Sequence, residues 1–262
     1  MTTAVASHTE RMIVVGGKNV RLLEGGSGAP CVVLHHSTGN PGWIPFYDEL
    51  AKTFSVVVPD MPGYGQSERP EWAREPRDIA ILVNRILDQL GLEGVTLVGL
   101  GLGGFVASEM ATMNESRLRS IVLIGATGLQ PESGEILDQM LVDFDEYVKS
   151  GFRDEHSYTA VFGEELAPEI KQLWDFSREM TARITWKPYM FSRKMPNLLG
   201  EVSTPVLVLH GDNDRVVPPV CAQQYGKLLP NSKVELIAGG HLVEYEQPAD
   251  IASRVASHAG VA

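Results

Sequence analysis

The chain has 262 residues, of which 44% are hydrophobic and 21% are charged, and its formal net charge is −11. This length fits one large α/β domain or two small domains. The negative charge disfavours a nucleic-acid backbone or an anionic membrane as the main partner, since both favour clusters of Lys and Arg. The two cysteines, Cys31 and Cys221, are far apart, which argues against a disulfide framework or a zinc site.

The first part of the chain alternates predicted strands with predicted helices. The pair Gly16-Gly17 separates two short apolar segments, which is typical of a β-hairpin. Continuous apolar runs predict strands covered on both faces, and apolar residues three or four apart predict helices. In chain order these elements are hairpin strands at 12–15 and 20–23, a strand at 31–36, a helix at 43–54, a strand at 55–60 and a helix at 79–90.

The second part of the chain contains a long stretch in which predicted strands disappear. From about residue 128 to residue 199 acidic and aromatic residues mix, and helical spacing fits best. Strands and helices alternate again on both sides of that stretch. The elements are a strand at 95–99, a helix at 105–113, a strand at 120–125, helices at 136–147 and 168–184, a strand at 205–211, a helix after Pro219, a strand at 234–239 and a C-terminal helix.

Alternating strands and helices predict a mostly parallel central sheet with helices on both faces. We therefore expect a core domain made of residues 1–127 and 200–262, and a helical cap inserted at residues 128–199. The cap would lie above the carboxyl ends of the strands, which is the edge where open α/β sheets bind ligands.

The glycine-rich segment VTLVGLGLGGFVASEM allows two interpretations. Gly99, Gly101 and Gly104 fit the G-x-G-x-x-G fingerprint of a dinucleotide site. That fingerprint needs an acidic residue at the end of the next strand, and SIVLIGATG has none. The segment also fits the nucleophile elbow G-x-S-x-G, with Gly101 in the place of the serine. We favour the elbow, and expect no dinucleotide to bind.

Four further segments are similar to characteristic segments of a known protein family. LHHSTGNPGW is similar to an oxyanion loop, PDMPGYGQSERP to the loop after the fourth strand, LVLHGDNDRVVP to an acid segment and AGGHLVEYEQP to a histidine segment. Together and in this order they resemble the α/β-hydrolase superfamily. The resemblance implies the α/β-hydrolase fold, with His241 as base, Asp214 as acid and Gly101 at the nucleophile position.

The resemblance also implies an oxyanion hole made by the backbone N–H groups of Leu102 and Ser37. His36 stands where the family usually has a glycine, and it is either a wall of the pocket or a polar catalytic group. Trp186 in the cap is expected to line the pocket, together with Trp174, Tyr189 and Phe191.

Other residues compete for the roles of acid and nucleophile. Asp212 lies two residues from Asp214 and could be the acid instead. Ser37, Ser67 and Ser108 could replace the missing serine. Ser67 follows loop glycines and fits a turn, and Ser108 lies within a predicted helix, so Ser37 is the main alternative.

Three explanations fit Gly101. It could be an engineered inactivation of a serine hydrolase, the mark of a non-catalytic ligand-binding protein, or part of an enzyme that needs no seryl intermediate. We favour the enzyme, because a neutral imidazole can act as a base near pH 7 and the carboxylate orients it. The predicted function is hydrolysis of an ester, a lactone or a C–C bond beside a carbonyl by activated water. Cofactor-free lyase or isomerase chemistry is the alternative.

The expected partner is a small-molecule substrate, with no cofactor, metal, nucleic acid or membrane, and a homodimer remains open. Neither a signal peptide nor a run of about 18 apolar residues is found, so a cytoplasmic location is expected. A water is expected in the space that the serine side chain would fill, since that volume is roughly one water. A serine restored at Gly101 would then gain esterase activity.

Overall fold

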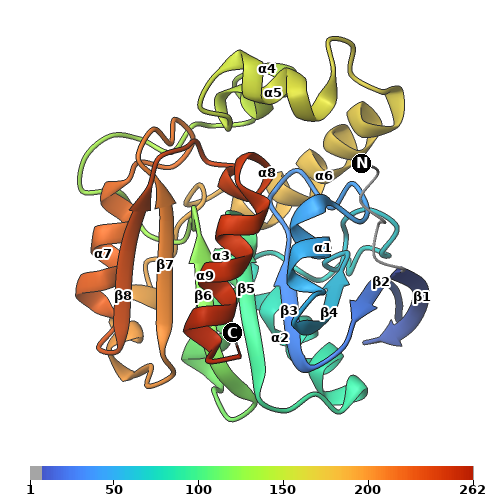
Figure 1. Cartoon of the computed structure of the whole chain (residues 1–262), viewed down its shortest axis with the longest axis vertical. Helices are drawn as coiled ribbons and strands as arrows, with labels where there is room; N and C mark the ends of the chain where they lie inside the picture. Colours follow the sequence, from blue (N-terminus) through green and yellow to red (C-terminus); the bar gives the residue numbers. More distant parts are fainter. Residues whose placement is uncertain (1–7, 262) are drawn as a thin grey trace.

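The computed structural model describes residues 8–261. Its centre is an eight-stranded sheet in the order β1-β2-β4-β3-β5-β6-β7-β8 (Figure 1). The first two strands form the predicted antiparallel hairpin, β2 pairs antiparallel with β4, and all the other pairs are parallel. The strands are β1 (His8–Val15), β2 (Lys18–Gly26), β3 (Ala29–Leu34), β4 (Phe54–Pro59), β5 (Val95–Leu100), β6 (Leu118–Ile124), β7 (Val206–Gly211) and β8 (Ser232–Ile237).

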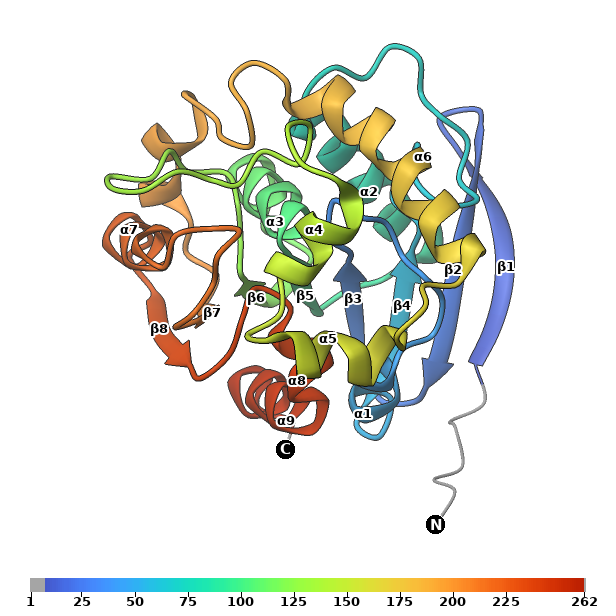
Figure 2. The same ribbon diagram turned by 90° about the horizontal axis from the view of Figure 1, so that it is seen from above.

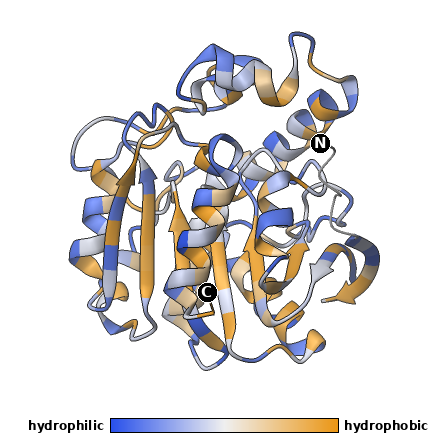
Figure 3. Cartoon of the chain, viewed as in Figure 1, coloured by the Kyte–Doolittle hydropathy of each residue, from blue (hydrophilic) through white to orange (hydrophobic). Residues whose placement is uncertain are grey.

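Helices cover both faces of the sheet. The central strands β5 and β7 are buried at every position, which is why they are continuous apolar runs and appear largely orange in Figure 3. One apolar cluster joins the sheet to α2, α3 and α7, and another joins it to α1 and α9. These helices are α1 (Pro45–Leu50), α2 (Pro76–Leu90), α3 (Leu102–Met113), α7 (Val220–Leu228), α8 (Val243–Glu246) and α9 (Pro248–Ala259). The architecture confirms the predicted α/β-hydrolase fold.

The segment between β6 and β7 lies above the carboxyl ends of the strands (Figure 1), and Figure 2 shows it from above. It contains three α-helices and two short 3₁₀ helices. The predicted boundaries between the core domain and the cap, at residues 128 and 199, stay a prediction. The elements are α4 (Phe144–Ser150), α5 (Glu155–Phe162), α6 (Pro168–Thr185), η1 (Met195–Asn197) and η2 (Leu199–Glu201).

The helix predicted over residues 136–147 is wrong. Only α4 forms there, from residue 144 onwards, and residues 136–141 are irregular. Their backbone is bound by distant residues instead: Leu137 N–H donates to the carbonyl of Val216 at 2.8 Å. The amide N–H of Gln139 donates to the Tyr189 hydroxyl at 3.0 Å. Tertiary hydrogen bonds thus replace the helical ones.

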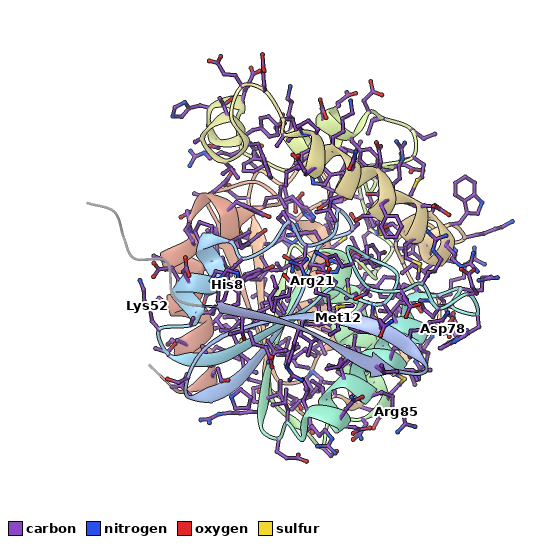
Figure 4. The ribbon with its side chains drawn as sticks, turned by 90° about the vertical axis from the view of Figure 1, so that its right-hand side faces the viewer. His8, Met12, Arg21, Lys52, Asp78 and Arg85 are labelled. Atoms are coloured by element: carbon purple, nitrogen blue, oxygen red, sulfur yellow. The ribbon has the colours of Figure 1, made fainter. Side chains whose placement is uncertain are left out.

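A buried carboxylate ties the two loops that border the site. Asp60 accepts from Arg21 Nη1 at 3.2 Å and from Asn40 Nδ2 at 3.3 Å. Figure 4 shows this side of the molecule, with Arg21 on β2 and Met12 on β1 labelled. The loop after β3 is thereby fixed to the start of the loop after β4. Within residues 8–261, no helix combines the length and apolar content needed to cross a bilayer.

Candidate active site

The turn between β5 and α3 has the geometry of a nucleophile elbow. Gly101 has φ 51° and ψ −109°, a conformation that strains any residue with a side chain. The turn also passes close to its neighbours, since a β-carbon on Gly103 would overlap the carbonyl of Leu34. The flanking glycine is therefore required by close backbone approach, as the elbow interpretation predicted.

His241 and Asp214 meet beside this elbow. His241 Nδ1 lies 2.8 Å from Asp214 Oδ2, and both side chains are buried. The other oxygen of Asp214 accepts the backbone N–H groups of Val216 and Val217, each at 2.8 Å. His210 Nε2 also lies 3.0 Å from Asp214 Oδ2. The carboxylate is thus held from four directions, with one oxygen directed at the imidazole.

Asp212 does not contact His241. Its Oδ1 accepts the backbone N–H of Gly239 at 3.2 Å, which fixes the loop that carries the histidine. The prediction that Asp214, and not Asp212, is hydrogen-bonded to His241 is confirmed.

The surroundings set the charge of this pair. Burial opposes the charged form of His241, but Asp214 and, less strongly, Glu244 outweigh burial and raise its pKa above 6.5. Burial also opposes the charge on Asp214, but His241 and His210 hold the pKa of that carboxyl well below its usual range. Asp214 is therefore a carboxylate across the physiological range, and His241 Nε2 is directed at the elbow with no bonded partner within residues 8–261.

The imidazole of His36 occupies part of the space expected for a serine side chain. A β-carbon placed ideally on Gly101 would lie 2.5 Å from His36 Nδ1 and 3.1 Å from His241 Nε2. The first separation is too short for a carbon–nitrogen contact. The water expected in this space stays a prediction, and a serine at position 101 would require the His36 ring to move.

His36 has a carboxylate partner of its own. Its Nε2 lies 3.0 Å from Glu244 Oε1, and Glu244 is completely buried. The adjacent His35 is different, because both its nitrogens are used by the backbone: Nδ1 donates to the carbonyl of His36 at 2.7 Å, and Nε2 accepts from Met61 N–H at 2.9 Å. No sequence pattern indicates the pairing between His36 and Glu244, since the two are 208 residues apart.

The predicted oxyanion donors border the same space. Ser37 and Leu102 are buried, and within residues 8–261 neither backbone N–H donates to a protein acceptor. The Ser37 hydroxyl donates to Gln139 Oε1 at 3.1 Å and lies 3.3 Å from the Tyr147 hydroxyl. It is thus engaged by the cap and not by a histidine, which speaks against Ser37 as a replacement nucleophile.

The other two serines are also engaged elsewhere. Ser67 Oγ donates to the carbonyl of Asp60 at 2.7 Å, as expected for turn chemistry. Ser108 Oγ donates to the carbonyl of Gly104 at 2.8 Å, within its own helix. Neither hydroxyl is directed at His241.

A small cavity of about 10 Å³ adjoins His241, enough for roughly one water. Residues from α4, the oxyanion loop and the histidine loop enclose it: His36, Ser37, Thr38, Tyr147, Val148, Gly151, Val216, His241 and Leu242. Trp186 is not among them. It ends α6, is 66% exposed and lines a separate groove, so its prediction as a pocket residue is wrong.

A larger groove of about 600 Å³ has Glu244 among its lining residues. Its walls are mostly apolar and come from the loop before α1, from α5 and its following loop, and from α8. They include Trp43, Ile44, Phe162, Leu166, Ile170 and Tyr245, with Glu244 as the one charged member. Such dimensions suit a small apolar ligand. Within the described part of the chain, no cluster of three or more His, Cys, Asp or Glu is placed to hold a metal ion.

Comparison with known proteins gives consistent results. The chain matches the profile of the alpha/beta hydrolase family over residues 32–254. It is 28% identical to a 2-hydroxy-6-oxo-2,4-heptadienoate hydrolase of Pseudomonas putida, covering 94% of each chain. It is 28% identical to a 2-hydroxymuconate semialdehyde hydrolase of a Pseudomonas species, covering 94% of this chain and 92% of that protein. A serine hydrolase structure from Cycloclasticus zankles superposes with a TM-score of 0.80 at 19% identity, covering 97% and 99% of the two chains.

Proposed function

The chain belongs to the alpha/beta hydrolase family, and from this premise we propose that it hydrolyses a C–C bond beside a carbonyl in a small 2-hydroxy-6-oxo-dienoate. The observation that carries the proposal is the buried His241–Asp214 pair, whose free Nε2 is directed at an elbow without a side chain. The two similar Pseudomonas proteins are named for hydrolysis of such compounds. They favour this bond over the ester and lactone alternatives.

In the proposed reaction His241 Nε2 takes a proton from water, and the resulting hydroxide attacks the ketone carbon. Asp214 stabilises the imidazolium as it forms. The oxygen of the tetrahedral adduct takes the negative charge and accepts from the N–H groups of Ser37 and Leu102. The adduct then collapses to a carboxylic acid, and the electron pair of the broken C–C bond passes to the dienoate carbon, which takes a proton.

The size of the site supports water as the nucleophile. The cavity beside His241 has room for roughly one water, and His36 leaves no room for a seryl side chain. A dienoate needs more space than this cavity offers, so α4, which contributes Tyr147 and Val148, must shift when substrate binds.

The test is direct. The wild-type protein is incubated with 2-hydroxy-6-oxohepta-2,4-dienoate and with 2-hydroxymuconate semialdehyde, and loss of dienolate absorbance is followed together with the carboxylic acid released. Turnover with one acid formed for each dienoate consumed is expected. Stoichiometric binding without turnover would support a ligand-binding protein, and conversion without acid release would support a lyase or isomerase.

The activity should depend on pH through His241. A general base must be neutral, and Asp214 and Glu244 raise the pKa of His241 above 6.5 despite its burial. The specificity constant kcat/KM should therefore rise with pH, with the midpoint of the rise above pH 6.5. Asp214→Asn removes the strongest of the two favourable charges, so the midpoint should move to lower pH while the rate falls. A midpoint that stays in place in this variant would show that another group controls the profile.

A further inference from the structure

The buried pair of His36 and Glu244 takes no proton in the activation of water described above. We infer that His36, positioned by Glu244, is a second acid–base residue of this site and delivers the proton to the carbon that leaves when the C–C bond breaks. The assignment rests on the proposed function, because it concerns a step of that reaction.

The first argument is the position of the two imidazoles. The rings of His36 and His241 are 5.0 Å apart between centroids and inclined at 61°. His36 Nδ1 and His241 Nε2 both face the point beside Gly101 where a β-carbon would stand. Neither nitrogen is bonded to another protein atom within residues 8–261. A substrate carbonyl and the carbon next to it can therefore contact both rings at once.

The second argument is the free-energy cost of burying Glu244 beside His36. Glu244 is completely buried, its Oε1 contacts only His36 Nε2, and its Oε2 has no partner within the described residues. Burying a carboxyl group with so little compensation is unfavourable, and an apolar residue would avoid that cost. A ring that served only as a pocket wall would not need Glu244. The arrangement is typical of a site in which charge is used.

The third argument is the chemistry of the cleavage. When the C–C bond breaks, His241 already holds the proton taken from water and is directed at the new acid. The dienoate carbon receives the electron pair and needs a proton from another group. The pair His36–Glu244 then carries two protons, one on His36 Nδ1 and one shared between Nε2 and Glu244. It donates the proton on Nδ1, and Glu244 keeps Nε2 in place. Water thus supplies OH to the acid, and the proton on His241 returns to His36 through solvent.

The fourth argument is the match between Gly101 and His36. A serine side chain and the His36 ring cannot both fit, because the β-carbon alone would lie 2.5 Å from Nδ1. Because Gly101 has no side chain, space is left beside the elbow, and the His36 ring fills part of that space. An inactivated serine hydrolase would have no reason to hold a carboxylate-bound imidazole at this place.

Two substrates separate the role of His36 from that of His241. Cleavage of 2-hydroxy-6-oxohepta-2,4-dienoate requires protonation of carbon, whereas p-nitrophenyl acetate releases a phenolate that needs no proton. The variants are His36→Gln, which keeps a donor for Glu244, and Glu244→Gln. The matched control is His258→Gln, because His258 lies on α9 and, among residues 8–261, its side chain is hydrogen-bonded only to the carbonyl of Pro205. Thermal unfolding is measured for each protein.

We expect His36→Gln to lower kcat for the dienoate by about 10²-fold or more and to leave ester hydrolysis within a few fold of wild type. Glu244→Gln should lower the same kcat by less, since it acts through His36. Equal losses on both substrates, or no loss on either, would overturn the assignment while the proposed function stands. A wild-type protein that hydrolyses the ester and leaves dienoates intact would overturn the proposed function, and this assignment with it.

Discussion

Replacing His241 with Gln is expected to lower the turnover of a 2-hydroxy-6-oxo-dienoate by about 10²–10⁴-fold, the usual contribution of a general base. The glutamine amide cannot take the proton of water. Asp214→Asn should cause a loss of up to about 10⁴-fold, because an amide holds the imidazole in the wrong tautomer and cannot stabilise its charge. Steady-state kinetics on the purified variants measure both losses.

Asp212→Asn is the matched control for this prediction. Asp212 lies two residues from Asp214, and its Oδ1 accepts the N–H of Gly239 at 3.2 Å. The asparagine keeps an oxygen that can accept the same bond, so turnover should stay within a few fold of wild type. If Asp212→Asn and Asp214→Asn lost activity equally, the effect would come from the loop as a whole and not from the carboxylate that contacts His241.

Gly101→Ser is expected to destabilise the protein and to give no active serine. The new β-carbon would lie 2.5 Å from His36 Nδ1, and a side chain would have to adopt φ 51° and ψ −109°. Overpacking of this kind costs about 1–3 kcal/mol. The His36 ring, whose Nε2 lies 3.0 Å from Glu244 Oε1, would have to shift. Urea unfolding of wild type and variant measures the loss.

The same substitution in a His36→Gly background tests whether the His36 ring causes the destabilisation. With the imidazole removed, the serine should fit beside His241 Nε2, so Gly101→Ser should cost less free energy there than in the wild type. The double variant His36→Gly/Gly101→Ser should form a covalent adduct with an organophosphonate, detected by mass spectrometry, and the single variant Gly101→Ser should not. An equal cost of Gly101→Ser in both backgrounds would mean that His36 does not occupy the serine's space.

Local sequence patterns were sufficient to predict the sheet and the His241–Asp214 pair. Strands such as β5 and β7 are buried on both faces, so the sequence shows them as apolar runs whatever their order in space. His241, Asp214 and Gly101 follow strands in short segments with recognisable glycines. The carboxyl ends of parallel strands meet at one edge of the sheet, so these segments converge once the strands are assigned.

The cap was less predictable, because its residues are held by contacts from elsewhere. Residues 136–141 have apolar residues at helical spacing, but the backbone bonds Val216 and Tyr189 instead of forming a helix. The helix α5 was not predicted, although Asp154 caps it by accepting the N–H of Ser157. Trp186 is aromatic and lies in the cap, yet the end of α6 directs it to solvent.

By itself the sequence determined the fold, the glycine-rich turn at Gly101 and the meeting of His241 with Asp214, because each depends on residues next to a strand. Only the tertiary structure decided what takes the place of the serine. His36 lies in the loop after β3 and Glu244 lies on α8, 208 residues away, so no spacing along the chain relates them. Their contact forms only when the loop after β3 and the helix α8 pack together beside the turn at Gly101.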